Sequence, residues 1–401
     1  MNAVPNANPG EPKEIKNIVS DQQLLCARFS PCGQFLVAGS HEGSVRRWRV
    51  AGEKPAAAPN AAPAEAPDAL ADLLSDDKKK AAKPAKAKQQ DAKAAGEASA
   101  VEFAPLAPLT GFNGWVQALA FHPSDKLLFA ADSWGKLNCT AYDGESPKPR
   151  WENPAAHDGW IRRIAVSPDG KLLATCGRDG FVRVWNSADG KPVAKHEHGS
   201  DIFAVVFAPD GTQIVFGDGL GKIAALDFSA GKIAREFDAA ALHKLDRLQD
   251  IDGLRALAFV KDGKTLVAAG LLPKNGGTVQ GTPMLLYFNF ASGKLEQQFT
   301  HGDVKDGYIE DIAVHPGGYV IGVSSGVPGN GMVMFHRPDE KTAFYFSTKI
   351  ANCASVALHP DGRRFAVAAT NKGSNGNGRR LSADGEYLGN NSPLHLFEIP
   401  A

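Results

Sequence analysis

A glycine recurs at the same position of a repeated sequence pattern in this chain of 401 residues. Four segments each contain an apolar stretch, a first turn with a proline, a second apolar stretch and a second turn. The glycine of the second turn stands 12 residues after that proline in all four, at Gly43, Gly135, Gly180 and Gly221. A constant offset through otherwise different residues predicts one hairpin geometry used repeatedly, with a backbone position that favours positive φ. A repeat of about 40 residues in a chain rich in β-forming stretches is typical of propeller blades.

Three further units follow the first four, with longer interruptions; they begin LRALAF, YIEDIAV and ASVALHP. Each unit has a strand with period-2 alternation, a turn, and further strands rich in β-forming residues. A fourth, more polar strand is expected over residues 101–109, 191–198, 232–238, 294–300 and 343–350. The sequence therefore predicts an all-β fold, a seven-bladed β-propeller of four-stranded antiparallel blades.

The two ends of the chain predict how the ring closes. The third strand of the seventh unit finishes at Ile399, which leaves no residues for a fourth strand. Residues 13–19 (KEIKNIV) form a spare strand before the first unit. We expect this N-terminal strand to pair into the last blade, because closure leaves no long unpaired sheet edge. A disordered tail is the alternative.

The third unit carries a distinctive set of residues: His157, a Pro168-Asp169-Gly170 turn, Asp179 and Trp185. His157 and His198 each stand 11 residues before a turn proline, and Trp48 and Trp185 share an offset of 17. With these features the chain resembles the WD40 repeat family of seven-bladed β-propellers. The resemblance implies a hydrogen-bond chain from Trp through a Ser or Thr and the His to the turn Asp. It therefore implies structural roles for these residues: His157, Asp179, Trp185, His198 and Trp48.

The repeats also depart from that pattern. Gly177 stands two residues before Asp179, where the resemblance leads us to expect Ser, and Glu42 replaces Asp in the first unit. We therefore expect that no blade contains the complete hydrogen-bond chain.

Composition limits the classes of protein to consider. Lys+Arg and Asp+Glu both number 44, so the net charge gives no reason to expect nucleic acid as a partner. No stretch approaches 18 apolar residues and the amino terminus lacks the apolar stretch of a signal peptide, so we expect no membrane association. The five cysteines are scattered and form no CxxC motif, which indicates reduced, buried thiols in a cytoplasmic protein. The Pro-Asp-Gly turns and compact units further suggest a bacterial source.

The sequence predicts a single domain over residues 13–401, with a flexible tail at 1–12. Within the first blade, residues 51–100 are rich in Ala, Lys and Pro and contain no aromatic residue, which predicts a disordered insert between the third and fourth strands. Leu70, Leu73 and Leu74 have helical spacing and could form one turn for a partner's groove, although a solvated linker is the simpler interpretation.

Other insertions are expected on one face of the ring. Residues 239–253 lengthen the approach to the fifth unit, and 271–283, 325–331 and 371–393 lengthen turns in units five to seven. Loops on a rigid scaffold frequently carry binding function, although neutral drift of exposed loops explains them equally well.

No catalytic, metal or cofactor motif is found in the sequence. His196-Glu197-His198 resembles a metal site, but His198 has a structural role by register and no third ligand is evident. Asp246, Asp250 and Asp252 lack the spacing of a calcium loop, and the glycine-rich stretches lack the ending of a phosphate loop. Arg379-Arg380 is weak support for an anion site. We therefore expect no cofactor and no metal.

Aromatic placement is the most specific functional signal. Trp115, Trp160 and Tyr308 each stand 8 residues before a turn proline, which places them where a first strand begins. Trp134 occupies the turn where the third unit has Asp179, and Arg178 precedes that Asp. Because Trp, Tyr and Arg dominate binding hot spots, we expect these five residues to bind a partner on the top face. Packing over neighbouring blades is the alternative.

We therefore predict a non-catalytic scaffold that binds a protein or peptide, a monomeric propeller within a larger complex. The alternative is a propeller-type enzyme, a metal-dependent hydrolase or lactonase, for which Asp201, Asp250 and Asn352 would stand near the channel. A third possibility is pure assembly through the insert, which deletion of residues 55–98 would test.

Overall fold

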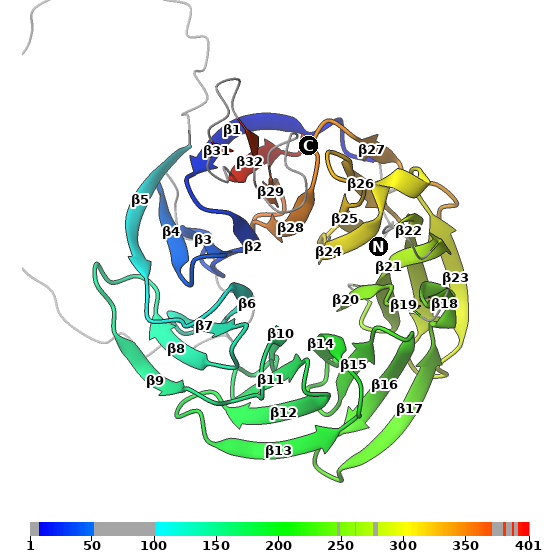
Figure 1. Cartoon of the computed structure of the whole chain (residues 1–401), viewed down its shortest axis with the longest axis horizontal. Helices are drawn as coiled ribbons and strands as arrows, with labels where there is room; N and C mark the ends of the chain where they lie inside the picture. The colour runs from blue at the N-terminus through cyan, green and yellow to red at the C-terminus, as the bar shows by residue number, and fades with distance from the viewer. Residues whose placement is uncertain are drawn as a thin grey trace, which may run out of the picture.

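The computed structural model describes residues 8–51, 101–246, 249–260, 262–275, 280–370, 380–381, 387–388 and 392–400. Seven four-stranded antiparallel sheets are arranged as blades around a central axis, as Figure 1 shows in the view down that axis. The predicted seven-bladed β-propeller is confirmed. The predicted insert at 51–100 lies almost wholly outside the described residues, and so does most of the 1–12 tail.

Each blade consists of strands that run in order from the axis to the circumference. The inner strands are β2 (Leu24–Phe29), β6 (Val116–Phe121), β10 (Ile161–Val166), β14 (Ile202–Phe207), β20 (Leu254–Phe259), β24 (Tyr308–Val314) and β28 (Cys353–Leu358). The second strands are β3 (Phe35–Ser40), β7 (Leu127–Asp132), β11 (Leu172–Gly177), β15 (Ile214–Asp218), β21 (Thr265–Asn275), β25 (Val320–Ser325) and β29 (Arg364–Ala369). The third strands are β4 (Val45–Ala51), β8 (Leu137–Ala141), β12 (Phe181–Asn186), β16 (Lys222–Asp227), β22 (Gln280–Asn289), β26 (Gly331–His336) and β32 (Ser392–Glu398). The outer strands are β5 (Glu102–Leu109), β9 (Pro149–Asn153), β13 (Pro192–Glu197), β17 (Lys232–Asp238), β23 (Leu295–Thr300), β27 (Tyr345–Ser347) and β1 (Lys13–Ser20).

The N-terminal strand closes the ring. β1 pairs antiparallel with β32, from Lys13 opposite Glu398 to Ser20 opposite Ser392, and is the outer strand of blade 7. Both ends of the chain therefore contribute to one sheet, and the predicted closure is confirmed.

The hydrophobic cores lie between neighbouring blades rather than within a single sheet. Leu24, Leu36 and Trp48 of blade 1 pack with Ala366 and Leu394 of blade 7. Because each blade is covered on both sides, the second strand β3 is buried along its whole length. Fully burying one Leu, Val or Phe side chain contributes about 1.5–3 kcal/mol, so the ring is stabilised mainly at these junctions.

The recurrent glycines have the predicted backbone geometry. Gly43, Gly135, Gly180 and Gly221 all have φ between 73° and 91°, where a side chain would be strained. These second turns lie beside the starts of the inner strands: the Ser133 amide donates to the Trp115 carbonyl, and the Arg178 amide to the Trp160 carbonyl. The second turns and the turns that lead into the inner strands therefore lie on one face of the ring, which we call the top face.

Three of the predicted insertions contain regular secondary structure. Residues 239–253 form a short 3-10 helix, η1 (Ala240–Leu242), and a hairpin of β18 (Lys244–Asp246) and β19 (Gln249–Ile251). The insertion at 271–283 extends β21 and β22, which pair from Leu271 opposite Pro283 to Asn275 opposite Gln280. A second 3-10 helix, η2 (Val304–Asp306), precedes β24, and the short strands β30 (Arg380–Leu381) and β31 (Tyr387–Leu388) pair within the insertion at 371–393.

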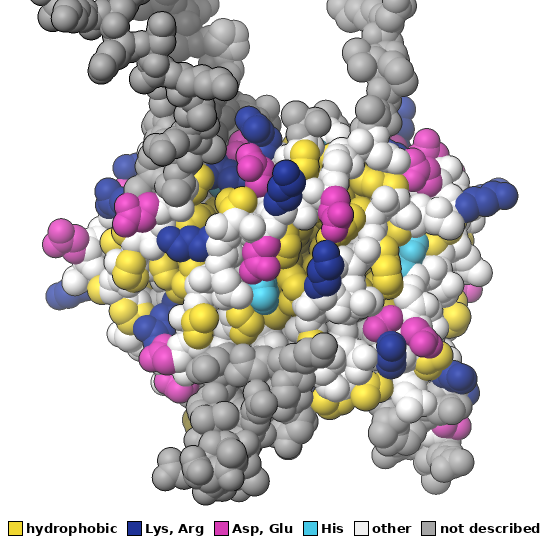
Figure 2. All heavy atoms as spheres, turned by 90° about the horizontal axis from the view of Figure 1, so that it is seen from above, with side chains coloured by type: hydrophobic (Ala, Val, Ile, Leu, Met, Phe, Trp, Pro, Cys, Tyr) yellow, Lys and Arg dark blue, Asp and Glu magenta, His cyan; other side chains and the backbone are white. Residues whose placement is uncertain are grey.

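The circumference carries mixed charge. Figure 2 shows one side of the ring, on which basic and acidic side chains are interspersed and no large patch of one sign gathers. Among the described residues, no helix is both long enough and apolar enough to cross a membrane.

Candidate functional site

Aromatic and arginine side chains meet around the top of the inner strands. The His41 and Trp115 rings lie 4.4 Å apart between centroids, and Trp115 meets Trp160 edge to face at 5.4 Å. The guanidinium of Arg162 lies over the Trp160 ring, 4.2 Å from its centroid. Blades 1, 2 and 3 are thus joined by one run of stacked side chains.

The run continues across blades 4, 5 and 6. Arg162 and Arg255 both lie over the Phe203 ring, at 4.6 and 4.7 Å. Arg255 also lies 3.9 Å from the centroid of Tyr308. We call this set the rim row; its members are His41, Trp115, Trp160, Arg162, Phe203, Arg255 and Tyr308.

Carboxylates hold both arginines of the rim row in place. Arg162 Nη2 donates to Asp201 Oδ2 at 2.6 Å, and Arg255 Nε lies 3.7 Å from Glu310 Oε2. Burial raises the pKa of Glu310, although the neighbouring Arg255 and Arg163 oppose that shift. Because both guanidiniums are fixed by ion pairs and ring contacts, the rim row is ordered before any ligand arrives.

The five residues predicted to bind a partner differ in exposure. Trp134 is 70% exposed and Trp115 is 39% exposed, and Arg178 is also exposed. Trp160 is half-buried, and Tyr308 is buried because Arg255 covers its ring. The structure therefore brings Trp115, Trp160 and Tyr308 into one row and leaves Trp134 and Arg178 on the neighbouring turns.

Two buried polar atoms of blades 2 and 3 lack a hydrogen-bond partner among the described residues. They are the indole Nε1 of Trp160, a donor, and Oε1 of Gln117, an acceptor. Gln117 lies on β6, two residues after Trp115.

Charged side chains also meet inside the channel, at positions that no sequence motif indicated. Arg28 Nη1 donates to Asp311 Oδ2 at 2.8 Å, and the Ser355 hydroxyl donates to the same oxygen at 2.6 Å. Burial alone would raise the pKa of Asp311, but Arg28 and Arg163 hold it below its usual value. The cluster lines a cavity of about 320 Å³, so it fills a gap between inner strands with paired charges.

The residues of the alternative enzyme hypothesis do not come together. Asp201 is paired with Arg162, Asp250 with His243 at 2.8 Å, and the Asn352 Oδ1 accepts from the Gly329 amide. Across the part of the chain that the structure describes, no three His, Cys, Asp or Glu side chains are placed to hold a metal ion.

Blade 3 contains a complete buried hydrogen-bond chain. Trp185 Nε1 donates to Thr175 Oγ1 at 2.8 Å, Thr175 Oγ1 lies 2.7 Å from His157 Nε2, and His157 Nδ1 lies 2.9 Å from Asp179 Oδ1. The expectation that no blade has the complete chain is therefore wrong. The hydroxyl comes from Thr175 in the middle of β11, which points into the blade junction, and not from the position of Gly177.

Burial and neighbouring charges shift the pKa values of His157 and Asp179 in this hydrogen-bond chain. Burial would raise the pKa of Asp179, but hydrogen bonds from His157 and Arg183 hold it well below its usual range. Burial lowers the pKa of His157, so its ring is neutral at neutral pH. His157 Nδ1 lies 2.9 Å from Asp179 Oδ1 and 2.7 Å from Arg183 Nη1, while its Nε2 contacts the Thr175 hydroxyl, so polar groups surround the buried ring on both sides.

The other blades use shorter versions of this arrangement. His198 Nε2 lies 2.9 Å from Asp218 Oδ2, and the Ser200 hydroxyl donates to the same carboxylate at 2.8 Å. In blade 2, Asp132 accepts from the amides of Trp134 and Lys136. Trp48 is buried in blade 1 at the position of Trp185.

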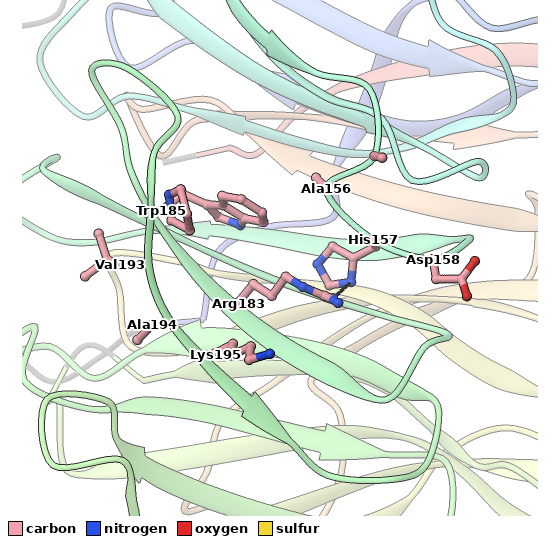
Figure 3. A pocket seen from close by; sticks show the side chains of 10 residues that line it. Ala156, His157, Asp158, Arg183, Trp185, Val193, Ala194 and Lys195 are labelled. Atoms are coloured by element: carbon pink, nitrogen blue, oxygen red, sulfur yellow. Dashed lines mark hydrogen bonds between the residues drawn. The ribbon is translucent and has the colours of Figure 1, made fainter.

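A groove lies beside the Trp185 chain at the circumference of blade 3. Its volume is about 750 Å³, and Figure 3 shows Trp185 and Val193 on its apolar side, with Arg183, Lys195 and Asp158 along the polar side. A similar groove of about 590 Å³ recurs at blade 4, which indicates that the splay of the outer strands produces both.

The repeat assignment rests on sequence as well as geometry. The WD domain, G-beta repeat family matches residues 15–49, which run from β1 through β4, and residues 152–186, which contain the blade 3 hydrogen-bond chain. This chain is a WD40-repeat propeller. The resemblance noted in the sequence is thereby confirmed.

Several curated proteins are similar to parts of this WD40-repeat propeller. Small ribosomal subunit protein RACK1y of Oryza sativa subsp. japonica is 31% identical over 101 residues, which are 25% of this chain and 30% of that protein. Small ribosomal subunit protein RACK1z of Arabidopsis thaliana is 45% identical over 56 residues, 14% of this chain and 17% of that protein. Apoptotic protease-activating factor 1 of Homo sapiens is 32% identical over 124 residues, 29% of this chain and 10% of that protein. The matched segments span less than a third of each relative, and all three relatives are eukaryotic, so a bacterial source stays a prediction.

Proposed function

We propose that this WD40-repeat propeller is a non-catalytic scaffold that binds a protein or peptide with the rim row and with Trp134 and Arg178 beside it. The observation that carries the proposal is the continuity of the rim row from His41 to Tyr308 across six blades. Large aromatic and arginine side chains that are already fixed lose little entropy on binding, which is why they dominate hot spots.

The exposure of two tryptophans also supports a binding site on the top face. Trp115 and Trp134 are among the few large apolar side chains that the described residues leave exposed. An extended peptide that covers these two tryptophans would bury the exposed parts of their rings.

The relatives agree with a role within a larger assembly. Two of them are named as small ribosomal subunit proteins, that is, as components of a multi-protein particle. We infer that this propeller also acts by contacting other proteins. Its five cysteines are free thiols and four of them are buried, which supports a reducing, cytoplasmic location.

The test is co-purification from native lysate with the Trp115→Ala/Trp160→Ala variant. Truncating a central hot-spot residue costs about 2 kcal/mol or more, so recovery of the bound protein should fall at least about tenfold. The control is Lys171→Ala, a change in the exposed first turn of blade 3 on the opposite face. Equal recovery with both folded variants would defeat the proposal.

A further inference from the structure

Two buried histidines meet at the junction of blades 5 and 6, away from the rim row. His301 follows β23, and His336 ends β26; their ring centroids are 4.9 Å apart. His336 is completely buried and His301 is 7% exposed. The Nε2 atoms of both rings are buried without a hydrogen-bond partner among the described residues.

This arrangement is costly unless something occupies the two nitrogens. Leaving a buried polar atom unpaired costs about 1–3 kcal/mol, and here two such atoms lie in one cluster. By contrast, His157 and His198 are paired with carboxylates. Tyr287 Oη lies 2.9 Å from His336 Nδ1 and orients that ring, while the His336 Nε2 has no hydrogen-bond partner among the residues that the structure describes.

Two methionines lie at the same junction. Met332, Met334 and His336 alternate along β26, so all three side chains point to one face of the strand, and all are completely buried. A Cβ placed on Gly302, the neighbour of His301, would lie 3.3 Å from Met332 Sδ. The strand thus brings sulfur to the side of the blade that His301 covers.

The kinds of ligand atom at this junction determine which metal ion it would prefer. Hard and borderline divalent ions are usually held by three or more His, Cys, Asp or Glu side chains, and the described residues bring no such group together. Imidazole and thioether together favour a soft ion. An imidazole nitrogen binds a metal at about 2.0 Å, so one ion can bridge two rings at this separation.

We propose that His301 and His336, completed by the thioethers of Met334 and Met332, form a buried site for Cu(I) that links blade 5 to blade 6. Burial lowers the pKa of each imidazole to about 4, so both rings are neutral and able to coordinate at neutral pH. The ion would satisfy both nitrogens and add a cross-link to the apolar contacts and the Tyr287–His336 hydrogen bond that already join these blades.

The test is anaerobic competition for Cu(I) between the full chain and the chromophoric chelator bicinchoninate. The wild type should retain one equivalent, and its melting temperature should rise when that equivalent is added. His301→Asn and Met334→Leu should each weaken retention at least about tenfold, since even the loss of a supporting partner costs that much. X-ray absorption of the copper-loaded protein should show both nitrogen and sulfur ligands.

Met284→Leu is the matched control, because Met284 is equally buried but packs in the core between blades 4 and 5. It should retain copper as the wild type does. The free cysteines are the competing soft ligands, so copper that persists in a folded His301→Asn variant belongs to thiols and overturns the site. Failure of the wild type to retain any Cu(I) against the chelator overturns it as well.

Discussion

At the scale of single residues, the hydrogen-bond chain of blade 3 shows how a few polar atoms hold side chains in place within an apolar junction between blades. Thr175 carries both hydrogen bonds at its centre, one from Trp185 and one with His157. The resemblance predicts the hydroxyl at the position of Gly177, two residues away, because it counts back from Asp179 in the turn and not along the strand. The alternation of side chains along β11 places residue 175 beside the buried tryptophan, a relation that depends on tertiary packing.

We expect Thr175→Val to destabilise the protein by about 1–3 kcal/mol, because it keeps the shape of the side chain and removes the hydroxyl between two buried groups. Urea unfolding measures the loss. Thr212→Val, in an exposed turn, should change stability by no more than about 0.5 kcal/mol. An unchanged midpoint for Thr175→Val would show that the hydrogen-bond chain contributes nothing.

The same hydrogen-bond chain in blade 3 predicts how the free energy of unfolding depends on pH. The pKa of His157 is lowered by burial, so below its ordinary value of about 6.5 the unfolded chain takes up a proton that the folded protein does not. The free energy of unfolding therefore falls as the pH drops below about 6.5. Asp179, whose pKa is also lowered, adds a second loss below about pH 4, because the unfolded carboxylate is protonated first.

Urea titrations between pH 4 and 7.5 check this dependence. His157→Gln should reduce the slope of stability against pH between about 4.5 and 6.5. A slope that is the same in His157→Gln and in the wild type would contradict the assignment.

At the scale of strands, ring closure is the feature that the local pattern predicted best. Residues 13–19 are a spare strand before the first unit, and the seventh unit lacks an outer strand, so the pairing of β1 with β32 could be inferred without any contact information. The contacts inside the channel could not be inferred in this way. The Arg28–Asp311 pair joins strands 283 residues apart in the chain, and its inner-strand positions carry other side chains in most blades.

A designed disulfide tests the register of the closing strand. Asn17 and His395 lie opposite each other on β1 and β32, with side-chain nitrogens 3.3 Å apart. Asn17→Cys/His395→Cys should therefore form a disulfide on oxidation and gain about 2–4 kcal/mol over its reduced form. Ile18→Cys/His395→Cys puts the two thiols on opposite faces and should not link. Non-reducing electrophoresis with peptide mapping distinguishes them, and a one-residue register shift would reverse the result.

At the scale of the whole molecule, the seven blades explain why residues from six of them can share one rim. Strands that begin at the same height around an axis bring Trp115, Trp160 and Tyr308 together, as their common offset from the turn prolines predicted. The sequence did not indicate that Arg162, Phe203 and Arg255 connect them. Each of these three is the second residue of its inner strand, and only the ring geometry shows that they face each other across neighbouring blades.

Photo-crosslinking from the top face tests the central claim most directly. A photoreactive amino acid placed at position 134 should capture a partner protein in native lysate, and Trp115→Ala/Trp160→Ala in the same chain should abolish the adduct. The same group at position 171, on the opposite face, should capture none of that partner. Capture of the same partner from position 171 but not from position 134, or an adduct that survives loss of both tryptophans, would contradict a binding site on the top face.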